Sequence, residues 1–223
     1  MPEAFDVGNE IGWKVFQANA LLKKNVFLSP ISIEFALCAL FEGSKGTIRK
    51  SAAHFLKLDS SKSPLNPDLA ALFKSLREDK GVKIEIANSI WTSLTPSNSY
   101  RKLVHDRYAA EIHSADFSSP EKISVDINDW VSKATNNIIT KVVIPSDLDG
   151  ALMALANAIY FKGSWDENFD AKLTKEDDFQ SSKGKLLAHF MNRVENFSYF
   201  EDVSVQVLEL PYRQRSTSMV IFI

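Results

Sequence analysis

The sequence has little cysteine and no excess of charge of either sign. Its 223 residues include one cysteine, Cys38, so no disulfide can form within the chain and packing must hold the fold together. This cysteine content is typical of cytosolic proteins, although secreted proteins can share it. Twenty-six basic and 28 acidic residues give a net charge of −2. That balance argues against a broad binding surface for nucleic acid or for an anionic membrane.

A secretory leader and a membrane-spanning run are also missing from the sequence. The opening stretch MPEAFDVGNEIGWKVF mixes acidic and apolar residues and lacks the continuous apolar core of a signal peptide. We therefore expect a cytosolic location and no membrane partner. If the chain were secreted instead, the sequon Asn196-Phe197-Ser198 would become a possible glycosylation site.

Residue types that carry catalysis or bind metals are present, but not in a functional arrangement. His54, His105, His113 and His189 are scattered and match no metal-binding spacing. The sequence has no Gly-x-Ser-x-Gly elbow and no glycine-rich phosphate loop. Cys38 lies within FALCAL, where burial would raise the pKa of its thiol and block access. We predict that the chain is not an enzyme and needs no metal or cofactor.

Helical patterns dominate the first 140 residues. Apolar residues at helical spacing predict an amphipathic helix over 3–22. Ser29 is a candidate N-cap with Pro30 at the first helical position, and the apolar residues after them predict a helix buried on most sides. The stretch GSKGT at 43–47 then predicts a turn between two helices.

Three more helices are expected before residue 140. One follows Asn66 and Pro67, and a second covers 100–112. The third begins near Ser119 and Pro120. Its core-facing stripe is predicted to be Ile127, Trp130, Val131, Ala134 and Ile138.

Strand patterns become frequent toward the end of the chain. Alternation over 82–91 predicts a strand with one wet face, and 151–162 is apolar on both faces, which favours a central strand covered from both sides. Residues 164–184 are charged and resemble a loop, whereas 203–210 and 219–223 predict strands. Helices followed by strands indicate an α+β fold, which we assign to a single domain over 1–223.

Asn157 is out of place in its segment, because it interrupts the apolar run ALANAIYF at 154–161. Leaving a buried amide unpaired costs roughly 1–3 kcal/mol, so this side chain needs partners. The simplest interpretation is a bond to one nearby backbone carbonyl.

Several motifs in order resemble the serpins, the serine protease inhibitor family. They are NVFLSPISIEFALCALFEGSKG at 25–46, IEIANSIWTS at 84–93, INDWVSKATNNII at 127–139, NAIYFKGSWDENF at 157–169, and LELPY with SMVIFI near the end. The resemblance covers nearly the whole chain. It implies N-terminal helices packed on a large central β-sheet, with further strands beyond.

The resemblance also implies roles for four residues. Ser29, Ser32 and Asn157 correspond to the buried polar cluster, the shutter, beneath the sheet. Trp165 resembles the tryptophan at the top of that sheet, the breach. In the family a reactive loop, once cleaved by a serine or cysteine protease, inserts beside the strand that matches 151–162. The inhibitor is a single-use suicide substrate rather than a catalyst.

The family's hinge and reactive loop have no counterpart in these 223 residues. We therefore expect the chain to represent the N-terminal portion of the serpin fold and not to inhibit proteases by itself. The alternative is a non-inhibitory binding or scaffold protein. A scaffold of this kind could take up a strand of another chain, because exposed sheet edges recruit strands.

Overall fold

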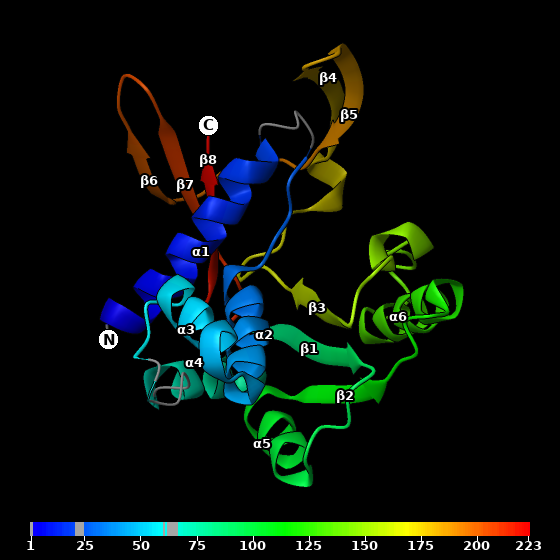
Figure 1. Ribbon diagram of the computed structural model, residues 1–223. Coiled ribbons are helices and arrows are strands. Elements are labelled where there is room, and N and C mark those ends of the chain that lie inside the picture. Colours follow the sequence, from blue (N-terminus) through cyan, green and yellow to red (C-terminus); the bar gives the residue numbers. More distant parts are fainter. Residues whose placement is uncertain (1, 21–24, 60, 62–66) are drawn as a thin grey trace. The chain divides into compact units, whose positions relative to one another are not determined.

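The computed structural model describes residues 2–20, 25–59, 61 and 67–223, with helices first and strands later (Figure 1). This order confirms the predicted α+β class. The helices are α1 (Pro2–Ala20), α2 (Pro30–Gly43), α3 (Gly46–Phe55), α4 (Pro67–Glu78), α5 (Asn98–Tyr108) and α6 (Pro120–Ala134), with short 3-10 turns η1 (Pro145–Leu148) and η2 (Ala171–Leu173). The strands are β1 (Val82–Thr92), β2 (Ala110–Ser114), β3 (Met153–Gly163), β4 (Lys175–Ser181), β5 (Gly184–Phe190), β6 (Ser198–Glu201), β7 (Gln206–Pro211) and β8 (Ser218–Phe222).

The described chain divides into two compact units. The first contains the residues up to Glu78 together with Ile84–Phe161, and the second contains Asp79–Lys83 together with Lys162–Ile223. The assignment of one domain to 1–223 stays a prediction. Each unit is described below by itself.

Helix α2 begins and ends where the sequence predicts. The Ser29 Oγ accepts a hydrogen bond from the backbone N–H of Ser32 over 3.4 Å, and Pro30 occupies the first turn. Seven of the helix's residues are buried, so the expected burial on most sides is confirmed. The helix ends at Gly43, and α3 begins at Gly46, where a φ of +57° lies in the left-handed region that glycine adopts easily. The predicted turn at 43–47 is therefore confirmed.

The helix predicted over 100–112 is too long. Helix α5 ends at Tyr108, because Ala109 adopts a left-handed conformation with φ 48° and ψ 37°. The next residues form β2, which pairs in parallel with β1 from Asn88↔Ala110 to Thr92↔Ser114. Pairing with a neighbouring strand outweighs the local helical pattern, as tertiary context often does.

The core stripe predicted for α6 is wrong at its last position. Helix α6 ends at Ala134, and Asn136 and Asn137 have positive φ angles of 51° and 62°, so the chain turns away from the helix axis. Ile138 consequently lies outside the helix and is 70% exposed. The prediction of a core-facing stripe is confirmed at Ile127 and Val131, which are buried.

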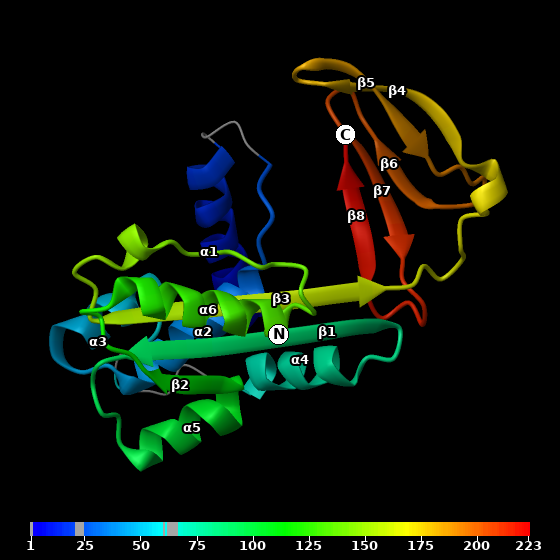
Figure 2. The ribbon, with the colours of Figure 1, turned by 90° about the vertical axis from the view of Figure 1, so that its right-hand side faces the viewer.

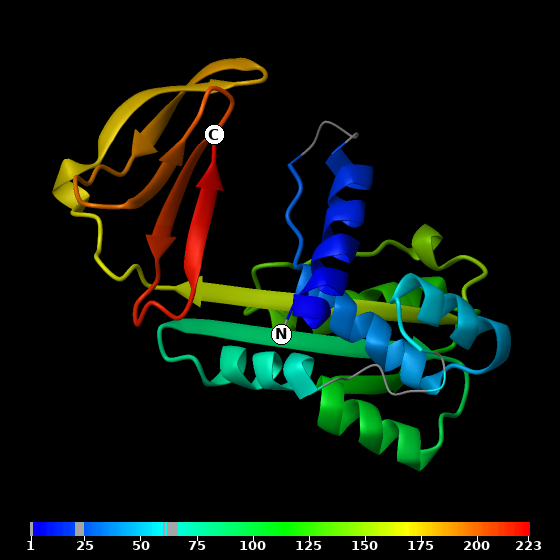
Figure 3. The same cartoon turned by 90° about the vertical axis from the view of Figure 1, so that its left-hand side faces the viewer.

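The sheet of the first unit has the strand order β2-β1-β3 and separates two apolar cores. Figures 2 and 3 show α6 on one face of the sheet and α2 and α3 on the other. Ile86 of β1 belongs to the core with α2, while Trp91 belongs to the core with α6. The prediction of one wet face for β1 is therefore wrong beyond its first half, since every residue from Asn88 to Thr92 is buried.

Strand β3 confirms the strand predicted over 151–162, but not its central position. Figure 2 shows β3 running opposite to β1. It is the last strand in the order of the described sheet, so its outer edge pairs with no strand of the described chain. Of the residues of β3 only Ala158 is buried, and Met153 and Phe161 are 38% and 42% exposed.

The second unit contains a hairpin and a three-stranded sheet. Strands β4 and β5 pair antiparallel, so the loop predicted over 164–184 is wrong at β4. That strand shows no apolar alternation because nearly all its residues are exposed, and polar cross-strand pairs such as Asp178 with Lys185, 3.0 Å apart, accompany it. Strands β6, β7 and β8 form an antiparallel sheet in that order, which confirms strands near 203–210 and 219–223.

Within the described ranges, we find no helix with both the length and the apolar character required to cross a membrane.

Candidate functional site

Asn157 connects β3 to helix α2 and to strand β1. Its Oδ1 accepts a hydrogen bond from the Ser32 Oγ over 2.5 Å. Its Nδ2 donates to the Oδ1 of Asn88 over 2.7 Å and lies 3.5 Å from the carbonyl oxygen of Ala87. The amide thus uses both of its ends, which is more than the single backbone bond of the simplest interpretation.

Asn88 extends this network to the end of helix α5. Its Nδ2 donates to the backbone carbonyl of Tyr108 over 3.0 Å. Ser32 and Asn88 are both 0% exposed, so neither can exchange these partners for water. We call Ser32, Asn88 and Asn157 the polar network. It joins α2, β1, β3 and α5 through side chains whose loss would leave buried groups unpaired.

Ser29 lies beside the network rather than within it. Its Oγ caps α2 by accepting from the backbone N–H of Ser32, so it fixes the helix turn that presents the Ser32 hydroxyl. The structure therefore brings Ser32 and Asn157 into direct contact and joins Ser29 to them through the backbone. The switching role that the resemblance assigns to these three residues stays a prediction.

Asn88 was missed by the sequence reasoning, although a signal for it exists. It lies in IEIANSIWTS, where Asn88 and Ser89 interrupt an apolar strand just as Asn157 interrupts β3. Ser89 points to the opposite face of β1, where its Oγ accepts from the indole Nε1 of Trp91 over 2.9 Å and lies 3.4 Å from the carbonyl oxygen of Ala156. The polar residues inside the apolar strand β1 therefore belong to two hydrogen-bonded networks, with Asn88 on one face of the sheet and Ser89 on the other.

Trp165 lies in the second unit. Its indole stacks on the ring of Tyr212 with centroids 4.8 Å apart and planes 6° from parallel, and it meets Phe169 edge-on at 6.1 Å. Gly163 permits this arrangement, since a Cβ there would lie 2.5 Å from the Tyr212 ring. The aromatic cluster fixes the turn after β3, and its proposed role at the top of the sheet stays a prediction.

Two ionisable groups in α2 have pKa values raised by burial. The Cys38 thiol is 2% exposed, and burial raises its pKa far above the usual range, so the thiolate needed for nucleophilic chemistry does not form. Burial raises the pKa of Glu34, which is 7% exposed, to about 7. Across the described residues, no group of three His, Cys, Asp or Glu side chains is placed to hold a metal ion.

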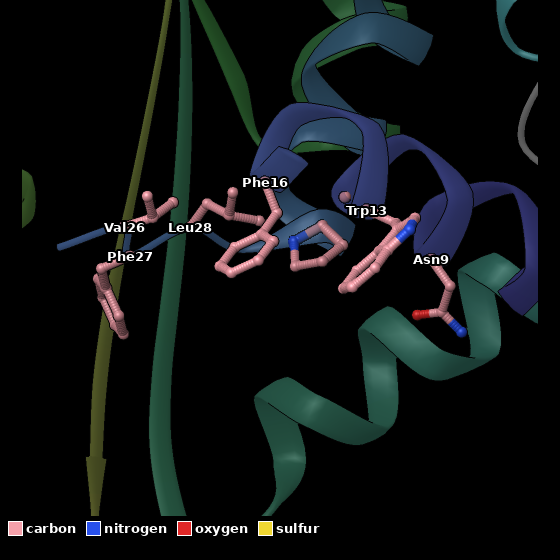
Figure 4. A pocket seen from close by; sticks show the side chains of 8 residues that line it. Asn9, Trp13, Phe16, Val26, Phe27 and Leu28 are labelled. Atoms are coloured by element: carbon pink, nitrogen blue, oxygen red, sulfur yellow. The ribbon is translucent and has the colours of Figure 1, made fainter. Parts of the chain in front are cut away.

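An apolar groove runs between helix α1 and the extended segment that precedes α2 (Figure 4). Phe27 is 93% exposed and Trp13 is 60% exposed, so large aromatic surfaces face solvent there. Figure 4 shows Phe16 and Trp13 among the side chains that line the groove, and their rings are stacked with centroids 5.6 Å apart. The groove can accept an apolar partner.

Comparison with known proteins places these features in one family. A family profile described as Serpin (serine protease inhibitor) matches residues 6–223. The chain is 35% identical over 199 residues to Serpin-ZX of Arabidopsis thaliana, which covers 85% of this chain and 51% of that relative. It is 32% identical over 218 residues to Serpin A12 of Rattus norvegicus, covering 94% of this chain and 53% of the relative.

A solved structure matches as well. The fold is similar to that of Arabidopsis AtSerpin1 in its native stressed conformation, with a TM-score of 0.80 and 29% identity, covering 99% of this chain and 60% of the other. The chain spans about half the length of the curated relatives it matches.

Proposed function

Because this chain belongs to the serpin family, we propose that it forms the N-terminal portion of a serpin-like inhibitor of serine or cysteine proteases. The observation that carries the proposal is the hydrogen-bonded chain Ser32–Asn157–Asn88 at β3. A buried polar network of this kind holds one arrangement firmly and can exchange partners when a neighbouring strand moves. It therefore suits a sheet that has to open.

The open edge of β3 supports the same proposal. A strand that added there would form ladder hydrogen bonds with β3 and would cover side chains that are now partly exposed, such as Phe161. Insertion would release free energy that a protease inhibitor of this family uses to trap its target. The trapping is stoichiometric, so the proposed role is that of a single-use inhibitor and not of an enzyme.

Residues 1–223 alone are not expected to inhibit, because no hinge-like run of small residues occurs in them. The test is to incubate the chain with trypsin-like and chymotrypsin-like serine proteases and with a papain-like cysteine protease. Denaturing gels should reveal no adduct with residues 1–223. The same assay on a product extended by a serpin hinge and reactive loop should reveal one. A denaturant-resistant adduct with residues 1–223 would refute the expectation that these residues alone do not inhibit.

The second candidate function is a non-inhibitory binding or scaffold protein. The apolar groove with Trp13 and Phe27 favours it, since surfaces of this kind take apolar partners. A peptide with the sequence of the C-terminal strands of Serpin-ZX tests it by strand complementation. A rise in melting temperature with a scrambled-peptide control at baseline supports the scaffold role, and no rise with either peptide contradicts it.

We propose that the protein works in a reducing compartment, because its single cysteine is free and buried. An extracellular location is the alternative that the family allows. Neither nucleic acid nor a membrane surface is proposed as a partner, given a net charge of −2.

A further inference from the structure

The segment 138–144 has the composition of a β-strand but forms none. Its sequence IITKVVI contains six β-branched residues, the type that strands favour, and one lysine. In the structure it follows α6 and pairs with no strand of the described chain. Four of its aliphatic side chains are between 39% and 70% exposed, namely Ile138, Ile139, Val142 and Ile144. Something other than local preference therefore keeps this segment out of a strand.

Side chains of α6 and of its C-cap make the hydrogen bonds that a neighbouring strand would otherwise make. The Oδ1 of Asn128 accepts from the backbone N–H groups of Val142 and Val143 over 2.8 and 3.2 Å. The Nδ2 of Asn128 donates to the carbonyl oxygen of Val143 over 2.9 Å. Just after the helix, the Oγ1 of Thr135, which is 1% exposed, accepts from the N–H of Ile139 over 3.1 Å. These two side chains satisfy the backbone at three residues of the segment, so no strand partner is needed there.

The two ends of the segment are fixed by local hydrogen bonds as well. Asn136 and Asn137 adopt the left-handed conformation, which asparagine tolerates, and reverse the chain after α6. The backbone N–H of Asn137 donates to the carbonyl oxygen of Ser132 over 2.7 Å. At the other end the Oδ2 of Asp147 accepts from the N–H of Ile144 over 3.0 Å. We call residues 136–144 the strap.

Apolar contacts, in contrast, attach the strap and α6 to the sheet. The core on this face joins the helix to Trp91 and Ala158 of the sheet, and Val143 of the strap packs against that core. Two side-chain hydrogen bonds also reach the strands, and both are exposed: Trp130 to Glu111 and Asn136 to Glu85. Among the described residues, no backbone hydrogen bond joins α6 or the strap to a strand. Lifting the helix and the strap together would therefore break no buried hydrogen bond of the described chain.

We propose that Asn128 clamps the strap to α6 and out of strand pairing, so that the helix and the strap open from the sheet as one body. The amide suits this role because it presents an acceptor and a donor to the same stretch of backbone. Opening as one body exposes apolar surface but leaves the hydrogen bonds of the strap intact, whereas the strap alone can open only by breaking them. The inference rests on contacts within the first unit and is independent of the proposed function.

Hydrogen exchange of individual amides, followed by NMR at increasing urea concentration, tests the clamp in the unmodified chain. The amides of Val142 and Val143 should be protected, although the Val142 side chain is 52% exposed. They should share the opening free energy and the urea dependence of amides in the middle of α6, such as that of Val131, because one opening exposes them all. Exchange of the Val142 and Val143 amides at the rate of an unstructured peptide overturns the proposal. So does a separate opening of the strap with a much weaker urea dependence.

Three variants separate the clamp from a general loss of stability. Asn128→Ala removes all three bonds, so the Val142 and Val143 amides should exchange about tenfold faster relative to amides in the middle of α6. Asn128→Asp keeps the acceptor for both N–H groups and should recover much of that protection. Asp129→Ala, at the next and exposed position of the helix, is the control and should leave the ratio unchanged.

Limited proteolysis gives a second measurement on the same variants. Trypsin should cut after the exposed Lys141 faster in Asn128→Ala than in the unmodified chain or in Asp129→Ala, because the strap then leaves the helix. Equal acceleration of exchange in the strap and in α6 of Asn128→Ala would mean that this amide supports the fold as a whole, which would overturn the proposal. Unchanged cleavage after Lys141 in that variant would overturn it too.

Discussion

The Oγ of Ser32 donates to the Oδ1 of Asn157 across 2.5 Å, although the two residues are 125 positions apart in the chain. The contact exists only when helix α2 and strand β3 have both formed and have come together. It explains why an amide lies inside an apolar strand: the polar network is the device that fixes β3 on the first turn of α2. Under the function that we propose, the same network would suit a sheet that opens beside β3.

Replacing Asn157 should destabilise the protein more than its partial exposure suggests. Asn157→Ala leaves the Ser32 hydroxyl and the Asn88 amide oxygen buried without their partner, which costs roughly 1–3 kcal/mol for each group. Urea unfolding followed by circular dichroism measures the loss. Met153→Ala on the same strand, 38% exposed, is the control and should cost well under half as much. Equal losses in the two variants would contradict a structural role for the amide.

Removal of the α2 cap should cost about 1 kcal/mol. Ser29→Ala deletes the oxygen that accepts from the Ser32 N–H and exposes a helix end to fraying. Ser119 occupies the same position at the start of α6 but makes no side-chain cap bond, so Ser119→Ala should change the free energy of unfolding very little. Urea unfolding of the two variants measures the contribution of the Ser29 cap to the free energy of unfolding. A larger loss for Ser119→Ala than for Ser29→Ala would refute the assignment of Ser29 as the cap of α2.

Glu34 should make the protein less stable as the pH rises. Burial raises the pKa of its carboxyl from 4.5 to about 7 in the folded state, so the folded chain binds the extra proton between these values. The stabilisation from that proton is complete below about pH 4.5 and is lost as the pH passes 7. Glu34→Gln removes the dependence. The difference in unfolding free energy between the variant and the unmodified chain should therefore grow by on the order of 3 kcal/mol from pH 4.5 to pH 8.

Glu10 provides the control for this series, because its pKa is lowered whereas that of Glu34 is raised. Lys14 and Lys57 lower the pKa of Glu10 to about 2, so the stability it adds is present at neutral pH and is lost only in acid. Glu10→Gln should leave the difference between pH 4.5 and pH 8 nearly unchanged. A similar slope for both variants would exclude the burial of Glu34 as the cause.

Cys38 should be inert toward thiol reagents in the folded protein. It is 2% exposed, and burial raises the pKa of its thiol, so both access and thiolate are lacking. An aromatic disulfide reagent should react with less than one equivalent at neutral pH and with one full equivalent in denaturant. Rapid reaction of the folded chain would show that α2 is not packed as described.

Local patterns predicted those parts of the fold that depend on short-range chemistry. The cap at Ser29, the proline after it and the glycines near residue 43 mark the ends of α2 because each acts on its own backbone. The apolar run over 151–162 likewise predicted β3. The mismatch of Asn157 with that run was enough to predict a buried polar contact. The resemblance grouped it with Ser29 and Ser32, and of these two only Ser32 bonds to it in the described chain.

Features that depend on pairing between residues far apart in the chain were not predicted from the sequence. Strand β2 forms because β1 offers an edge to residues 110–114, and the local pattern there is helical. Strand β4 is almost wholly exposed, so it lacks the apolar alternation by which strands are detected. Asn88 interrupts an apolar strand as Asn157 does, but its partners, Asn157 and Tyr108, could not be identified because they lie 69 and 20 positions away in the chain.

A double-mutant cycle on Ser32 and Asn157 tests the account most directly. Ser32→Ala, Asn157→Ala and the double variant are unfolded in urea alongside the unmodified chain. The hydrogen bond across 2.5 Å predicts that the double variant loses less stability than the sum of the single losses, with a coupling of about 0.5–3 kcal/mol. Losses that add within error would mean that Ser32 and Asn157 act independently, and the polar network would then not be what holds β3 to α2.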